Sequence, residues 1–131
     1  SDLYISAKLC EVLMYDGRLE EAATEVDRAK QINPTGSDIL YEIEGILKFW
    51  QEDYNASKEL LGRIILPSPV ASVFAAGAEF YLGNTVVAKQ NTMKIETEYG
   101  LTIRRLFDSE NYRIDAMKAK IAPLFPMRKV A

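Results

Sequence analysis

The chain has 131 residues, a net charge of −3, and a composition that is 48% hydrophobic and 27% charged. This balance is typical of a folded globular domain and excludes a disordered chain. There is no histidine and only one cysteine, Cys10, so an intramolecular disulfide is excluded, the usual general base and zinc ligands are missing, and we expect no enzyme, no metal and no other cofactor.

The first expected element is a pair of helices over about 3–15 and 19–32. Apolar and small side chains recur along both at three- and four-residue spacing, which is the period of an amphipathic helix. Gly17 allows a tight turn between them, and Pro34 ends the second helix because the residue before a proline avoids the helical conformation. Two antiparallel helices joined by so short a turn form a helical hairpin.

Two further hairpins are expected. The second has helices over about 38–50 and 54–65, with Asp53 as the cap of the later helix. Its end is set by two prolines, and Ser68 is then expected to cap the third hairpin, with helices over about 70–82 and 86–98. The residues expected to face inward from the last of these helices are Val87, Ala88, Met93 and Ile95.

The last 31 residues depart from this pattern. We expect a short helix near 102–107 and a final helix over about 110–122, which together cover the open apolar face of the third hairpin. Residues 94–131 carry 8 basic and 5 acidic side chains, whereas residues 1–93 carry 8 basic and 14 acidic side chains. This basic tail could contact phosphate, but no nucleic-acid motif with interleaved aromatic residues accompanies it, so a nucleic-acid partner is not favoured.

The hairpins also repeat. The small and apolar residues Leu9, Leu13, Ala22, Val26 and Ala29 are echoed 34 residues later by Ile43, Leu47, Ala56 and Leu60. A fixed period of this length is typical of a solenoid of helical hairpins. The first hairpin resembles a tetratricopeptide repeat at Leu9, Gly17, Ala22, Ala29 and Pro34. The second and third are divergent copies: Gln51 stands in place of the turn glycine, and Gly45 and Tyr54 fit better with a shift of one residue.

The resemblance implies an all-α fold, a right-handed α-α superhelix of about three hairpins with a C-terminal capping helix. We expect one domain over 1–131, with repeats at about 3–36, 37–68 and 69–100 and a cap at 101–131. Divergent repeats of this kind resemble the C-terminal regions of bacterial multidomain signalling proteins, of the adenylate cyclase or winged-helix regulator type. We therefore expect a cytoplasmic fragment of a larger protein, and no membrane partner because every apolar stretch is far shorter than the roughly 20 residues of a membrane-spanning helix.

In the tetratricopeptide family the first helix of each pair lines a concave face that holds a protein or peptide. The resemblance places on this face Tyr4, Glu11, Met14, Tyr41, Lys48 and Tyr81. Tyrosines anchor partners well because they give a large contact area at low entropy cost. Glu11, Glu42 and Glu44 nearby favour a neutral or basic partner segment. The alternative is a homo-oligomerisation module that packs through the third hairpin or through residues 124–127.

Overall fold

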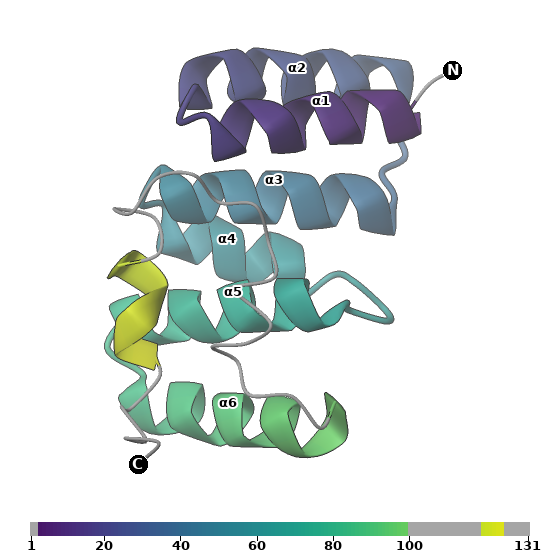
Figure 1. Ribbon diagram of the computed structural model, residues 1–131. Coiled ribbons are helices and arrows are strands. Elements are labelled where there is room, and N and C mark those ends of the chain that lie inside the picture. The colour runs from purple at the N-terminus through teal and green to yellow at the C-terminus, as the bar shows by residue number, and fades with distance from the viewer. Residues whose placement is uncertain (1–2, 100–118, 125–131) are drawn as a thin grey trace.

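The computed structural model describes residues 3–99 and 119–124 (Figure 1). These residues form helices and no strand, which confirms the all-α fold for this part of the chain. The elements in chain order are α1 (Leu3–Tyr15), α2 (Leu19–Ile32), α3 (Asp38–Trp50), α4 (Tyr54–Leu61), α5 (Pro69–Tyr81), α6 (Thr85–Tyr99) and the 3-10 helix η1 (Ala122–Leu124). The expected helix near 102–107 and most of the one over 110–122 lie outside the described residues.

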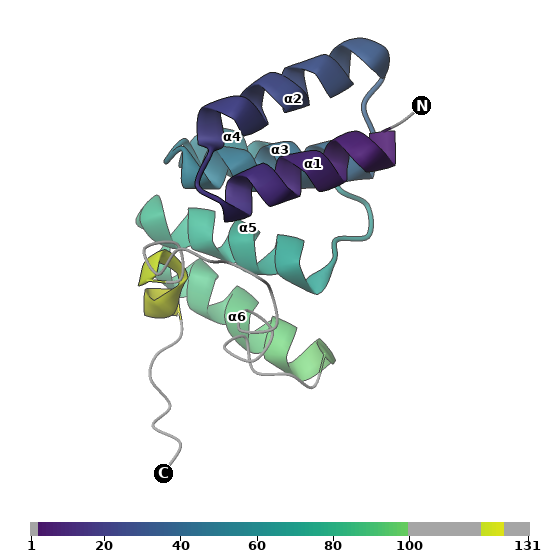
Figure 2. The ribbon, with the colours of Figure 1, turned by 45° about the horizontal axis from the view of Figure 1, so that its top comes forward.

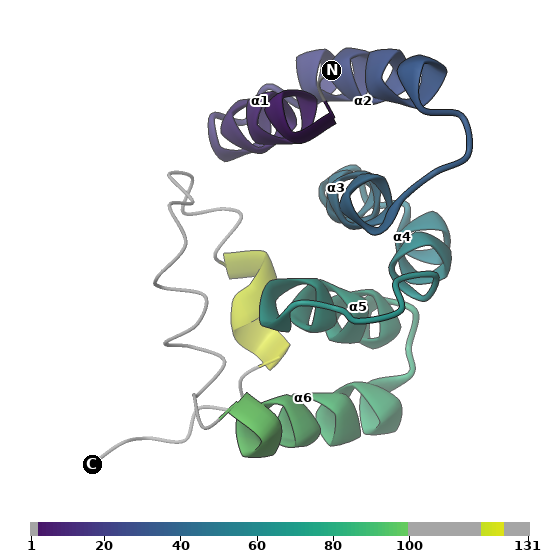
Figure 3. The same ribbon diagram turned by 90° about the vertical axis from the view of Figure 1, so that its right-hand side faces the viewer.

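The helices pack as three hairpins stacked in chain order. Within the hairpins α1 packs on α2, α3 on α4 and α5 on α6, and successive hairpins touch through α2 and α3, α4 and α5, and the row formed by α1, α3 and α5. Figure 3 shows α2 and α4 on one side of this row, and η1 against α5 on the other. We call the η1 side of α1, α3 and α5 the inner face, and the side formed by α2 and α4 the outer face.

Local sequence signals explain where the helices begin. Ser37, Asp53 and Ser68 each accept a hydrogen bond from the main-chain N–H three residues later, which satisfies an otherwise unpaired helix donor. Pro69 then occupies the first helical turn of α5, where its missing N–H costs nothing. The expected caps Asp53 and Ser68 are confirmed.

Each tight turn within a hairpin contains one residue with a positive φ. The residues are Gly17 (φ 77°), Glu52 (φ 66°) and Gly83 (φ 91°). The turn position of the second hairpin is therefore Glu52 and not Gln51. Glycine adopts this left-handed conformation without steric cost, whereas a glutamate is strained in it.

Small residues stand at fixed distances before and after each of these turn residues, and in the first two hairpins they contact each other across the helix pair. The pairs are Cys10 with Ala22, Gly45 with Ser57, and Ala76 with Ala88, and all six residues are buried. The turn residues of the first and second hairpins are 35 positions apart, and those of the second and third are 31 apart. The second hairpin is therefore shifted by one residue from the 34-residue repeat, as Gly45 and Tyr54 predict. The 34-residue echo pairs Ala56 with Ala22, but in the second hairpin Ser57 occupies the close contact and Ala56 is half-buried one position away.

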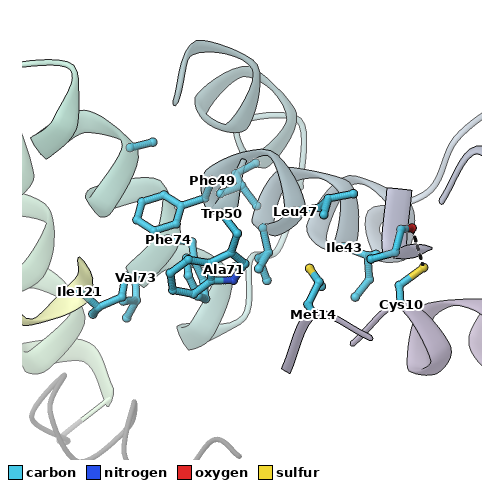
Figure 4. Packing of buried hydrophobic residues seen from close by; sticks show 14 of the residues in the cluster. Cys10, Met14, Ile43, Leu47, Phe49, Trp50, Ala71, Val73, Phe74 and Ile121 are labelled. Carbon is cyan, nitrogen blue, oxygen red and sulfur yellow. Dashed lines mark hydrogen bonds between the residues drawn. The ribbon is translucent and has the colours of Figure 1, made fainter. Parts of the chain in front are cut away.

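An aromatic cluster joins the second hairpin to the third. The Phe49 ring is fully buried and meets the rings of Trp50, Tyr54 and Phe74 edge-on at centroid distances of 5.1, 5.4 and 5.2 Å. Trp50 also packs edge-on against Phe74 at 5.2 Å. Figure 4 shows Phe49, Trp50 and Phe74 in one continuous core that extends to Met14 and Cys10 in the first hairpin.

Two expected details of the helices are wrong. The helix expected to reach residue 65 ends at Leu61, where Gly62 and Arg63 form a turn, and Ile65 and Leu66 are exposed to 83% and 86%. In α6 the buried residues are Ala88, Thr92 and Ile95, which recur every three or four positions. Val87 and Met93 lie off that line and are exposed.

Candidate functional site

The six residues predicted to line one partner-binding face do not come together. On α1, Tyr4 and Glu11 are accessible and Met14 is buried in the core. On α3, Tyr41 and Lys48 lie on the outer face. Tyr81, at the end of α5, lies on the inner face. Two places with distinct chemistry emerge: a groove on the outer face and an aromatic cluster on the inner face.

Met14 cannot contact a partner. Its side chain is 1% exposed and belongs to the core cluster. The reason lies in the helical period, because Met14 shares the buried face of α1 with Ala7 and Cys10. Tyr4 and Glu11 are accessible, and Lys8 links them: its ammonium lies 5.6 Å from the centre of the Tyr4 ring and 3.4 Å from the Glu11 carboxylate.

Tyr41 and Lys48 line a groove of about 500 Å³ between the end of α2, α3 and α4. This groove, which we call the outer groove, stays open because α4 has 8 residues where α2 has 14. Two ion pairs lie along it: Lys30 contacts Glu44 at 3.0 Å and Arg63 contacts Glu59 at 2.6 Å. Arg63 also lies over the Tyr41 ring at 5.6 Å. Tyr41 and Lys48 thus lie among residues of α2 and α4, and the structure does not bring them together with Tyr81, whose hydroxyl contacts Lys120.

On the inner face, three aromatic rings surround the ammonium of Lys120. The Lys120 Nζ lies 5.1 Å from the ring centre of Tyr54, 5.5 Å from that of Tyr81 and 6.0 Å from that of Phe49. The Glu52 carboxylate forms an ion pair with the same ammonium. We call Phe49, Tyr54, Tyr81 and Glu52 the aromatic cage.

The hairpin architecture brings the cage residues together at one end of the stack. Phe49 is near the end of α3, Glu52 lies in the following turn, Tyr54 begins α4 and Tyr81 ends α5. Figures 1 and 2 show the α3–α4 turn, the end of α5 and η1 at this same end. The Tyr54 and Tyr81 rings stack at 5.0 Å with an interplanar angle of 16°, so the two rings support each other beside Lys120.

Main-chain and aliphatic contacts hold the segment 119–124 beside the cage. The Tyr81 hydroxyl donates a hydrogen bond to the main-chain carbonyl of Lys120. Ile121 and Leu124 are buried in the core cluster. Leu124 lies over Gly77, where an added Cβ would stand 3.3 Å from the Leu124 side chain and 2.7 Å from the Phe49 ring, so only glycine leaves the space.

Electrostatics keep the caged lysine charged. Burial works against the ammonium, but hydrogen bonds to Glu52 and Tyr54 outweigh burial and raise the pKa of Lys120. Hydrogen bonding to Lys120 lowers the pKa of Glu52, and burial raises the pKa of the Tyr81 hydroxyl. At neutral pH the cage therefore holds a cation beside a carboxylate and a neutral phenol.

Three further properties of the described residues concern a metal site, a reactive thiol and a membrane span. Over residues 3–99 and 119–124 no three His, Cys, Asp or Glu side chains are grouped so that they could hold a metal ion. Burial, helped by the charge of Glu25, raises the pKa of the Cys10 thiol to about 11, which disfavours the nucleophilic thiolate. Within the same ranges no helix combines the length and the apolar character needed to cross a membrane.

The sequence singles out Tyr81 as a candidate contact but does not connect it with Glu52, Tyr54 or Lys120. Tyr54 reads as an ordinary core residue, Glu52 as a turn residue and Lys120 as one charge of a basic tail. Lys120 is 68 residues from Glu52 and 39 from Tyr81, so no local spacing could pair them. The one usable signal is the placement of aromatic residues at the ends of successive helices.

Comparison of the chain with protein-family models, curated proteins and solved structures gives no match. The class that the described residues define is an all-helical domain of stacked hairpins. Its inner face carries a short segment of the same chain, held through a caged lysine.

Proposed function

We propose that this chain is a non-catalytic helical-repeat domain, a TPR-like right-handed superhelix, that binds a protein or peptide partner. In this proposal it is a cytoplasmic regulatory segment of a larger bacterial signalling or transcription-regulator protein. The observation that carries the binding role is the seating of residues 119–124 on the inner face. The stacked hairpins already hold one short peptide segment there.

The contacts to this segment are of the kinds that peptide-binding surfaces use. A cation sits among aromatic rings, a main-chain carbonyl accepts a hydrogen bond, and two aliphatic side chains are buried. Burying an isoleucine or leucine side chain contributes about 1.5–3 kcal/mol, and a caged cation contributes about 0.5–2 kcal/mol. Such a surface gains affinity from a few anchors in preformed positions.

Selection of peptides from a displayed random library against the full chain tests the proposal. We expect enriched sequences that bind in fluorescence anisotropy and that shift the amide resonances of Gly77 and Tyr81 in an isotope-labelled chain. Recovery of peptides at background level only would contradict the binding role. Shifts confined to Tyr41 and Lys48 would move the site to the outer groove.

The alternative is a homo-oligomerisation module, and a specific observation favours it. Ile5, Leu9 and Val12 lie on the outward side of α1 and are exposed to 63%, 43% and 61%. Of the expected self-association surfaces, Leu124 is buried and unavailable, whereas Val86 and Met93 of the third hairpin are exposed.

Sedimentation at several concentrations separates the hypotheses, because a monomer at all concentrations contradicts self-association. Leu9→Glu should abolish any dimer formed through α1.

A further inference from the structure

We propose that the aromatic cage is a recognition site for a lysine side chain of a partner peptide, and that Lys120 is an intramolecular competitor for it. The inference deepens the proposed function and rests on it. It assigns the partner a chemistry, a cationic peptide with aliphatic anchors, and it assigns residues 119–124 a regulatory role.

The geometry of the cage selects a cation. Three ring centres lie 5.1 to 6.0 Å from one ammonium, which is the range in which the ring quadrupole attracts positive charge. The Glu52 carboxylate adds a charge that a neutral side chain of the same length could not satisfy. A norleucine in the position of Lys120 would keep the aliphatic part of the side chain up to Cε, would lack the ammonium, and would lose both interactions.

The other contacts define the neighbours of that lysine. The Tyr81 hydroxyl binds a main-chain carbonyl, which every peptide has, so it fixes the path of the chain and not its sequence. Ile121 and Leu124 occupy buried positions one and four residues after the lysine, the latter above Gly77. The expected ligand is thus a lysine followed by aliphatic residues at the next and the fourth positions.

A partner peptide can compete with the internal segment because it can bury the same kinds of side chain as Ile121 and Leu124, while the segment's charged contact adds little. The Glu52 side chain is 68% exposed, and ion pairs open to water contribute little because solvent screens them. Residues 1–93 carry 8 basic and 14 acidic side chains, and this net negative charge attracts a cationic peptide to the domain. Competition then depends on how often the internal segment leaves the surface.

The experiment uses the complete 131-residue chain and its Lys120→Ala variant. The probe is a fluorescein-labelled synthetic peptide with the sequence of residues 117–126, made with lysine, trimethyllysine or norleucine at the position of Lys120. We expect the variant to bind the lysine peptide about tenfold more tightly than the unchanged chain does, because its own segment competes less well. We also expect the variant to prefer the lysine and trimethyllysine peptides over the norleucine peptide by about tenfold.

Two substitutions added to Lys120→Ala test the position of the site. Tyr54→Leu removes one wall of the cage and should lower the affinity for the lysine peptide about tenfold. Tyr41→Leu is the matched control, since it removes a tyrosine of the outer groove and should leave the affinity unchanged. If circular dichroism shows that Tyr54→Leu does not fold, Glu52→Gln replaces it and should reduce the preference for lysine over norleucine.

The outcomes separate the two proposals. Equal binding of the lysine and norleucine peptides by Lys120→Ala would overturn cation recognition and leave peptide binding standing. Equal binding of the lysine peptide by the variant and the unchanged chain would overturn the role of Lys120 as competitor. Absence of binding by all three peptides would overturn the whole inference, whereas the proposed function fails only if the library selection also yields nothing.

Discussion

The Ser57 hydroxyl donates a 2.7 Å hydrogen bond to the main-chain carbonyl of Gly45, directly across the contact between α3 and α4. In the first hairpin the Cys10 Sγ approaches the carbonyl of Ala22 at 3.8 Å in the mirrored sense. Both pairs are twelve residues apart, so one small side chain and one carbonyl meet at each crossing. These contacts set the register of the helix pairs and identify the positions where added bulk should be least tolerated.

Arginine substitutions at Ala22 and Ala56 should differ sharply. Ala22 is fully buried in the α1–α2 contact, so Ala22→Arg forces a charged side chain into the core and should destabilise the fold by about 3–5 kcal/mol or unfold it. Ala56 lines the outer groove, where a long side chain can reach water, and Ala56→Arg should cost less than about 1 kcal/mol. Thermal melts followed by circular dichroism measure both. Equal losses would contradict the register defined by Ser57.

Gly45→Ala should be costly because of one neighbour. A Cβ at this position would lie 2.6 Å from the Leu61 side chain, so the helices must separate or Leu61 must change rotamer, at about 1–3 kcal/mol. Urea denaturation of Gly45→Ala, Leu61→Ala and the double variant measures the coupling. We expect the double variant to lose less free energy of unfolding than the two single losses added together. Strict additivity would show that Leu61 is not the cause.

Alkaline pH should weaken the fold through Cys10. Burial raises the pKa of its thiol from 9.0 to about 11, so between these values the unfolded chain has lost a proton that the folded chain retains. The unfolded state then binds fewer protons, and the free energy of unfolding falls as pH rises from about 9 to 11. Urea melts at pH 8, 9 and 10 should show a smaller decline for Cys10→Ala than for the unchanged chain. Parallel declines would contradict the assignment.

Glu52→Gly should stabilise the hairpins and loosen the segment that they hold. Glycine relieves the left-handed strain at φ 66°, worth about 1 kcal/mol, and removes the carboxylate that pairs with Lys120. We expect a higher melting temperature together with faster tryptic cleavage after Lys120. Glu52→Gln is the control, because it removes the charge and keeps the strain, so it should speed cleavage without raising the melting temperature. Slower cleavage of Glu52→Gly would contradict the role of the ion pair.

The helices and their caps could be predicted because they depend on local spacing. The hairpin pattern can be predicted from two local signals. These are the apolar residues that recur in α1, α2 and α3, and the caps Asp53 and Ser68. The register of the second hairpin could not be predicted in this way. Ala56 and Ser57 are both small, and periodicity does not show which of two neighbouring residues lies in the helix contact. The register is set by the turn at Glu52, and no sequence signal predicts a positive φ at a glutamate.

The candidate site could be predicted only in part. Tyr81 follows from the position of α5, but its role depends on Lys120, which reaches it from another part of the chain. The family resemblance alone places Met14, Tyr41 and Lys48 on a shared face. Their positions in the core and in the outer groove follow from which side of each helix the neighbouring hairpins cover.

The packing of Trp50 against Phe74 gives this protein a built-in optical reporter. The chain contains a single tryptophan, so its emission arises from one site, at the joint between the second and third hairpins. Blue-shifted tryptophan emission will indicate that the second and third hairpins are packed together, and a red shift during denaturation will indicate that they have separated. Compared with the circular dichroism of the whole chain, that signal will reveal whether the third hairpin undocks before the other two unfold or together with them.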